Sequence, residues 1–247
     1  WFDKDGNSRY EPIIRAPLII VRLFFNDRIK AEQVELAWKT DKWHTKIVNS
    51  SIVGSARKIV ELRELGLPAT SNNAADIIEF LDAFVSLNRD ILPCEKTTNF
   101  IGWQGKDGFL IGEEPHGNCD VAFFSDNKGE MQFVDSFGKK GTFEEWKNVI
   151  EKVRHFPAIM GALYAALGTP LLKILNINGF TYELAGRTSR GKTTGLRIAV
   201  SVWGNPNENS SEGDDDKTQD SLIHSWSGTR VFFERTASLL NGIPLFV

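Results

Sequence analysis

The sequence has few of the residues from which disulfide frameworks and metal sites are built. Among its 247 residues are two cysteines, Cys94 and Cys119, and four histidines. Two cysteines cannot form a disulfide framework and no signal-peptide pattern opens the chain, so we expect a cytoplasmic protein. No paired C-x-x-C spacing occurs, and a loop His116 with a buried thiol is favoured over a zinc site. The histidines and cysteines form no recognisable nucleophile set.

A long apolar run and an excess of positive charge are also missing. The longest uncharged stretch, residues 156–172, is shorter than a usual membrane span and contains two prolines and two glycines. A buried helix is therefore expected there, and no membrane partner. The formal net charge is −3 and the pI is about 5.9, so any contact with nucleic acid must be local.

One stretch fits the pattern of a phosphate-binding loop. Residues 186–193 read GRTSRGKT and match G-x-x-x-x-G-K-[ST]. In such a loop the two glycines let backbone N–H groups surround a phosphate, the lysine reaches the β- and γ-phosphates, and the hydroxyl of Thr193 binds Mg²⁺. The predicted ligands are ATP and Mg²⁺. The predicted nucleotide-binding residues are Gly186, Arg187, Thr188, Ser189, Arg190, Gly191, Lys192, Thr193 and Thr194.

The surroundings of the loop favour a nucleotide site over a chance match. Residues 180–185 are rich in strand formers, and residues 194–200 can begin a helix, which gives the order strand, loop, helix. Arg187 and Arg190 could add charge near the phosphates, although exposed arginines beside a turn are more often only solvated. Thr194 either lies near the α-phosphate or is an ordinary residue of the first helical turn.

Apolar periodicity and turn residues predict the other elements. The first part of the chain is expected to contain strands at 16–25, 34–38 and 44–48, helices from Ser55 to Leu65 and at 74–88, and hairpins at 101–111 and 121–134. The second part is expected to contain a helix opened by a capping box at 142–145, an apolar helix at 156–175, a helix at 229–240 and a buried parallel strand at 243–247. Residues 207–220 are too polar to pack and are predicted to form a mobile surface loop.

Several separate blocks resemble a bacterial and phage family called "domain of unknown function 927", which occurs in helicase-like and primase-associated ATPases of mobile elements. The loop of that family usually has two serines where this sequence has Thr188 and Ser189, and an Arg190 follows; the phosphate-binding positions stay intact. The blocks that carry the resemblance are TNFIGW at 98–103, GTFEEW at 141–146, GTPLL at 168–172, LAGRTSRGKTT at 184–194, AVSVWG at 199–204 and HSWSGT at 224–229.

The resemblance implies a P-loop ATPase fragment of a DNA helicase or primase-helicase. By similarity, it acts on DNA, with single-stranded DNA the expected form, assembles as a ring of identical subunits and works with a primase or other replication partner. The catalytic residues stay unknown, because the acidic pair that should hold Mg²⁺ is expected beyond Val247. Both ends of the chain, Trp1 and Val247, look like cuts through a longer protein.

The predicted fold class is α/β, with two domains. Residues 1–140 should form an α+β domain with antiparallel hairpins, a DNA- or partner-binding appendage, and residues 141–247 should begin a P-loop domain with a parallel sheet. Two other functions compete with the helicase. A GTPase is disfavoured, because the near match to its guanine-reading motif, residues 127–130, precedes the loop and ends in Glu130. A non-catalytic nucleotide-binding assembly module remains open.

Overall fold

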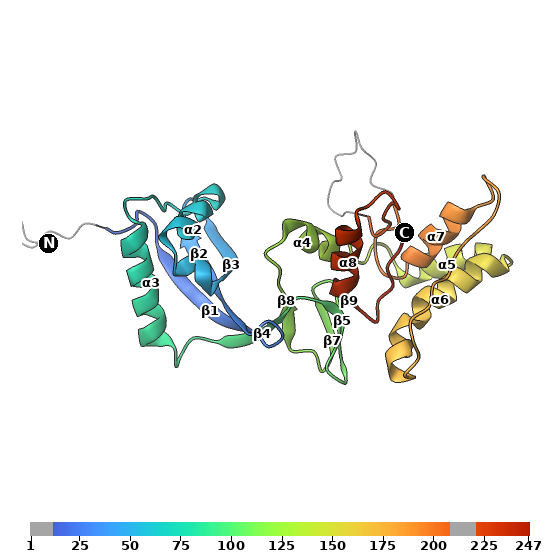
Figure 1. Ribbon diagram of the computed structural model, residues 1–247, viewed down its shortest axis with the longest axis horizontal. Helices are drawn as coiled ribbons and strands as arrows, with labels where there is room; N and C mark the ends of the chain where they lie inside the picture. The colour runs from blue at the N-terminus through green and yellow to red at the C-terminus, as the bar shows by residue number, and fades with distance from the viewer. Residues whose placement is uncertain (1–11, 208–220) are drawn as a thin grey trace, which may run out of the picture. The chain divides into compact units, whose positions relative to one another are not determined.

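The structure is a computed structural model that describes residues 12–207 and 221–247. The chain divides into two compact units, Trp1–Thr97 and Thr98–Val247 (Figure 1). Each unit has a hydrophobic core of its own. Residues 98–140 contribute to the second core, so the compact unit that contains the predicted phosphate loop begins at Thr98. This boundary differs from the one predicted at residue 140.

The first unit is a twisted mixed sheet with a long helix packed along it. Strands β1, β2 and β3 are antiparallel neighbours, and β4 pairs parallel with β1 on the other side. Short helices α1 and α2 and a 3₁₀ turn η1 connect the sheet to α3. The elements are β1 (Leu18–Asn26), β2 (Ala31–Lys39), β3 (Trp43–Asn49), α1 (Ser50–Val53), α2 (Ala56–Glu61), η1 (Leu62–Leu65), α3 (Ala74–Asn88) and β4 (Cys94–Thr98).

The core of the first unit lies between the sheet and its helices. Apolar side chains at spacings of three and four residues along α3 bury Ala74, Ile77 and Leu81 against the strands. The fully buried Gln33 accepts a hydrogen bond of 2.6 Å from the Thr97 hydroxyl, which satisfies its side-chain oxygen and joins β2 to β4. The expected strands and the helices from Ser55 and at 74–88 are confirmed.

In its described residues, 98–207 and 221–247, the second unit combines a small sheet with five helices. Strands β5, β6 and β7 form an antiparallel meander, and the short β9 pairs parallel with β5. The elements are β5 (Ile101–Gln104), β6 (Gly108–Ile111), β7 (Glu114–Gly117), β8 (Val121–Phe123), α4 (Lys128–Asp135), α5 (Phe143–Val153), α6 (Pro157–Ile174), α7 (Lys192–Val200), α8 (Arg230–Leu239) and β9 (Leu240–Asn241).

Three predicted helices of this unit are confirmed, and each begins where its sequence indicates. Thr142 and Glu145 form the expected capping box, with the Glu145 carboxylate 2.8 Å from the Thr142 amide nitrogen. The apolar helix becomes α6, with Pro157 in its first turn. The Thr229 side chain caps α8 by accepting from the Phe232 amide.

The hairpin predicted at 121–134 is wrong. Strand β8 is followed by helix α4, because Asn127 acts as a helix cap and not as a turn residue. Its side-chain oxygen accepts from the amides of Gly129 and Glu130 at 2.9 and 3.4 Å. Val134, on the following turns, is then fully buried in the second core.

The strand predicted at 180–185 is also absent. The segment is irregular, and Phe180 and Tyr182 are exposed. A strand needs a neighbour to accept its ladder of hydrogen bonds, and no strand pairs with this segment in the described parts of the chain. The parallel strand predicted at 243–247 is reduced to one parallel bridge between Phe246 and Ile223, although Ile243 and Phe246 are buried as expected.

Candidate functional site

The residues of the predicted phosphate loop lead directly into helix α7. Gly191 has φ 78° and lies in the left-handed region, which glycine adopts without steric cost, and the helix begins at the next residue, Lys192. Ser189 is also left-handed, with φ 59°. The chain therefore reverses sharply between Gly186 and Lys192 and presents its backbone at the N-terminus of a helix.

Packing on both sides fixes this helix start. Ala199 and Val200 at the end of α7 are buried in the second core, and Ile198 is buried as well. At Gly195 a Cβ atom would lie 3.0 Å from the Leu184 side chain and 3.4 Å from that of Ile159, so glycine lets α7 approach α6 and the incoming segment closely. The orientation of the helix N-terminus is thus set by the core.

The segment before the loop is held by a side chain and not by a sheet. The Tyr182 hydroxyl donates a 2.9 Å hydrogen bond to the Ala158 carbonyl in the first turn of α6. Leu184 packs against the second core. These two contacts place Gly186 beside α6 and α7 even though residues 180–185 form no strand.

The backbone of the loop offers unpaired hydrogen-bond donors. The Gly195 amide donates to the Gly191 carbonyl at 2.9 Å, whereas within the described residues the preceding amides of α7, from Lys192 to Thr194, make no hydrogen bond of normal geometry. The residues of the loop are exposed, except for Lys192, which is half-buried. Unpaired N–H groups at a helix N-terminus attract anions, because the helix dipole adds partial positive charge there.

Lys192 lies across the loop. Its Nζ donates to the carbonyl oxygens of Gly186 and Arg187 at 2.9 and 2.8 Å, so the ammonium is positioned over the turn. Arg187 and Arg190 bring the loop to three cationic side chains, and residues 184–194 contain no carboxylate. The donor set is therefore amides, an ammonium and hydroxyls, a set that suits phosphate oxygens and, through a threonine hydroxyl, a hard cation.

The nine predicted site residues all lie in this turn and the first turn of α7. Thr193 and Thr194 are exposed, and their hydroxyls make no hydrogen bond to any described residue. The Thr193 hydroxyl is the metal ligand that the pattern predicts. The described residues contain no group of three or more His, Cys, Asp or Glu side chains suited to hold a metal ion.

The other candidates from the sequence lie apart from the loop. The His224 ring contacts the rings of Phe133 and Phe232, with centroids 5.3 and 4.9 Å away, and burial lowers the pKa of its imidazole. Glu234 is an exposed helical carboxylate paired with Arg230 at 2.6 Å. Of the acidic stretch at 207–220, residues 208–220 lie outside the described part of the chain.

Two tryptophans to which the sequence analysis gave no structural role, Trp103 and Trp203, donate hydrogen bonds to carbonyl groups of α6. Pro170 has no N–H to donate to the Ala166 carbonyl one turn earlier in α6. That carbonyl instead accepts from Trp203 Nε1 at 3.1 Å and from the Thr169 hydroxyl at 2.8 Å. Trp103 Nε1 donates to the Pro170 carbonyl at 2.9 Å. A proline inside a predicted helix, here Pro170, indicates that the carbonyl four residues earlier needs a donor from elsewhere in the chain.

Helix α6 has a second apolar face that no described residue covers. Of the helices in the described residues, α6 alone is long and apolar enough to cross a membrane. Length and composition by themselves are weak evidence for a membrane span. Of this helix, 17% is buried. The predicted burial holds for the face with Ala162, Leu163 and Ala166. The exposed apolar side chains recur every three or four residues, at Tyr164, Leu167, Leu171 and Ile174.

Comparison with known proteins identifies the family. The model of the family "Domain of unknown function (DUF927)" matches residues 2–247. The chain belongs to the DUF927 family. No curated protein matches it.

A solved structure shares the fold of this DUF927 chain. It is described as "SCCmec type IV Cch - active helicase", with a TM-score of 0.64 and 22% sequence identity. The match covers 93% of this chain and 43% of the solved one, so the chain spans less than half the length of that helicase. The likeness establishes a mixed α/β fold common to both.

Proposed function

We propose that this DUF927 chain is the nucleotide-binding part of a P-loop ATPase that drives a helicase or translocase on DNA. The observation that carries the proposal is the loop itself: unpaired amides at the start of α7, with Lys192 bonded across them. Similarity in fold to a helicase supports the DNA-directed role. Single-stranded DNA, a ring of identical subunits and a primase partner remain parts of this proposal.

Different residues of the loop would contact different parts of a bound nucleotide. The amides from Arg187 to Thr193 would bind phosphate oxygens, and Lys192 would exchange its two carbonyl partners for the β- and γ-phosphates. The Thr193 hydroxyl would ligate Mg²⁺, whose role when bound is to neutralise phosphate charge. Arg187 and Arg190 would add positive charge at the entrance.

Two features support a larger ATPase domain around this loop. Phe180 and Tyr182 alternate with polar residues in an unpaired segment, as on a strand without its neighbours, and α6 exposes an apolar stripe. We propose that further strands pair with residues 180–185 and that their layer covers α6. An acidic pair following the apolar run Ile243–Val247 would supply the magnesium-binding carboxylate.

Nucleotide titration by calorimetry tests the assignment. Lys192→Ala should weaken binding of Mg-ATP by about tenfold to a hundredfold, because a hydrogen bond to a charged group contributes about 1.5–3 kcal/mol. Lys152→Ala, which removes an exposed lysine of α5, is the matched control and should bind as the wild type. Equal affinities for the wild type and Lys192→Ala would refute the nucleotide site.

The non-catalytic module is the second candidate. The observation that favours it is that residues 184–194, the loop and its flanks, contain no carboxylate. The two functions differ in turnover: a helicase motor hydrolyses ATP faster when single-stranded DNA is present, whereas an assembly module binds ATP without hydrolysing it. Phosphate release from the full-length protein, with and without an oligonucleotide, distinguishes them.

A further inference from the structure

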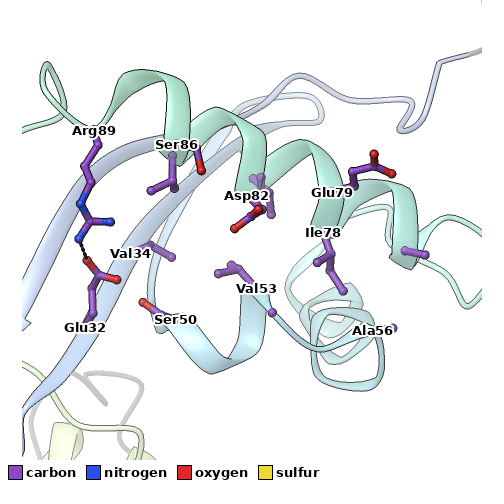
Figure 2. Close-up of a pocket in the computed structure, with 14 residues that line it drawn as sticks. Glu32, Val34, Ser50, Val53, Ala56, Ile78, Glu79, Asp82, Ser86 and Arg89 are labelled. Atoms are coloured by element: carbon purple, nitrogen blue, oxygen red, sulfur yellow. Dashed lines mark hydrogen bonds and ion pairs between the residues drawn. The ribbon is translucent and has the colours of Figure 1, made fainter.

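A groove in the first unit lies far along the chain from the phosphate loop. It has a volume of about 740 Å³ and runs between α3 and the segment Ser50–Ala56, with the start of β2 at its base. Figure 2 shows the side chains of Asp82 and Ser86 on the α3 side and those of Ser50 and Val53 opposite them. The size is within the range of ligand sites in proteins.

One face of α3 forms the longer wall. The lining positions follow the helical repeat from Ala75 to Arg89, the residue directly after α3, and a rise of about 1.5 Å per residue over these fourteen steps gives a wall roughly 21 Å long. A wall of this length suits an extended or helical protein segment better than a compact small molecule. The residues of this face are Ala75, Ile78, Glu79, Asp82, Val85, Ser86 and Arg89.

The groove combines an apolar floor with an acidic rim. Val34, Val53 and Ile78 contribute to the floor, and Val34 is 2% exposed. Glu79 and Asp82 are exposed on the rim and pair with no described cation. Helix α3 itself has no lysine or arginine to neutralise them.

The far end of the groove has polar groups in fixed positions. Arg89 Nη2 lies 2.8 Å from the Glu32 carboxylate, so this cation is already paired (Figure 2). The Ser50 hydroxyl is buried and makes no hydrogen bond within the described residues. An unpaired buried hydroxyl is unfavourable, and a ligand group that bonds to it removes that cost.

We propose that this groove binds a basic amphipathic protein segment. Apolar side chains of the segment would fill the floor between α3 and Ser50–Ala56, and its lysines or arginines would pair with Glu79 and Asp82. A backbone or side-chain group of the segment would bond to the Ser50 hydroxyl. This assigns the first unit a partner-docking role that is separate from nucleotide binding.

Charge argues against nucleic acid as the occupant. Phosphates would meet the two unpaired carboxylates of Glu79 and Asp82, and the one arginine in the lining, Arg89, is engaged by Glu32. The same carboxylates attract a cationic segment. The apolar floor is stabilised by burying apolar side chains, which a protein segment has and a phosphate backbone lacks. The observations therefore favour a protein partner.

Binding of synthetic peptides to the whole chain tests the proposal. The probes are 18-residue helical peptides with leucines on one face and either lysines and arginines or, in the matched set, glutamates beside them. Nuclear magnetic resonance should show shifts at Ser50, Val53, Asp82 and Ser86 with basic peptides only. Binding should weaken as salt is raised, since the rim charges are exposed.

Two variants with a control measure the charge contribution. Glu79→Gln with Asp82→Asn should weaken the basic peptides about twofold to thirtyfold, the loss expected for two exposed ion pairs. Asp76→Asn, on α3 but outside the groove, should leave the affinity unchanged. Because these side chains are exposed, the amide variants should fold, and circular dichroism checks this.

Three outcomes would overturn the proposal. The first is that none of the basic peptides binds at millimolar concentration. The second is that binding occurs but survives the double variant unchanged or shifts resonances elsewhere. The third is that a single-stranded oligonucleotide shifts the groove residues while the basic peptides do not.

Discussion

His224 is a half-buried ring whose protonation should affect stability. It contacts the rings of Phe133 and Phe232, and its Nε2 atom is buried without a hydrogen-bond partner in the described residues. Burial disfavours the charged imidazolium, so the pKa of His224 is lowered from its ordinary value of 6.5. Below that value the unfolded chain binds a proton more readily than the folded one.

The free energy of unfolding should therefore decrease as the pH falls below 6.5. The contribution of His224 is fully present above pH 6.5 and is lost as the pH falls through the lowered pKa of the folded state. Urea unfolding at pH 7.5 and 5.5 should therefore show a smaller loss for His224→Phe than for the wild type. His155→Phe, at an exposed position, is the control. An equal loss in all three proteins would contradict the prediction.

Sequence patterns predicted a phosphate loop at residues 186–193 but not the contacts that hold this segment. The spacing of Gly186, Gly191 and Lys192 carries that prediction, and the structure shows a turn there with Gly191 in the left-handed region. The bond from Tyr182 to the Ala158 carbonyl joins residues 24 positions apart. No local pattern encodes such a contact, because it depends on how α6 packs against the incoming segment.

Helix α6 depends on Trp203 for the carbonyl that Pro170 leaves free. Trp203→Phe removes the bond from Nε1 to the Ala166 oxygen and part of a buried ring, and should lower the free energy of unfolding by about 1–3 kcal/mol. Trp226→Phe is a matched change at a side chain that is 81% exposed, and should alter it by less than about 0.5 kcal/mol.

Urea denaturation followed by circular dichroism measures both variants. The Thr169 hydroxyl still bonds to the Ala166 carbonyl in Trp203→Phe, so the loss should stay below that of an unsatisfied buried oxygen. If the two tryptophan variants were equally stable, the bond between α6 and Trp203 would have no structural role.

Helices and strands could be predicted where neighbouring residues alone determine them. Helix α3 was predicted with its observed limits, because apolar periodicity and length agree. The segment 180–185 has strand-forming residues, yet a strand also needs a partner, and none is present in the described chain. At Asn127 one residue type suits both a turn and a helix cap, and burial of Val134 decides for the helix.

The whole chain is best divided where its two cores separate. The second core joins side chains from 98–140 to others from 162 onward, a long-range arrangement that composition alone did not indicate. Five of its fourteen buried members precede residue 140: Ile101, Leu110, Phe123, Val134 and Phe137. Trp103 also reaches from this region to the Pro170 carbonyl in α6.

Two fragments test this division. The fragment 98–247 contains every member of the second core and should unfold cooperatively in urea. The fragment 141–247 lacks five of those side chains, so it should bind a dye for exposed apolar surface and unfold without a sharp transition. Calorimetry and dye fluorescence compare them. A cooperative 141–247 with the same midpoint as 98–247 would show that the phosphate-loop part of the chain folds without residues 98–140.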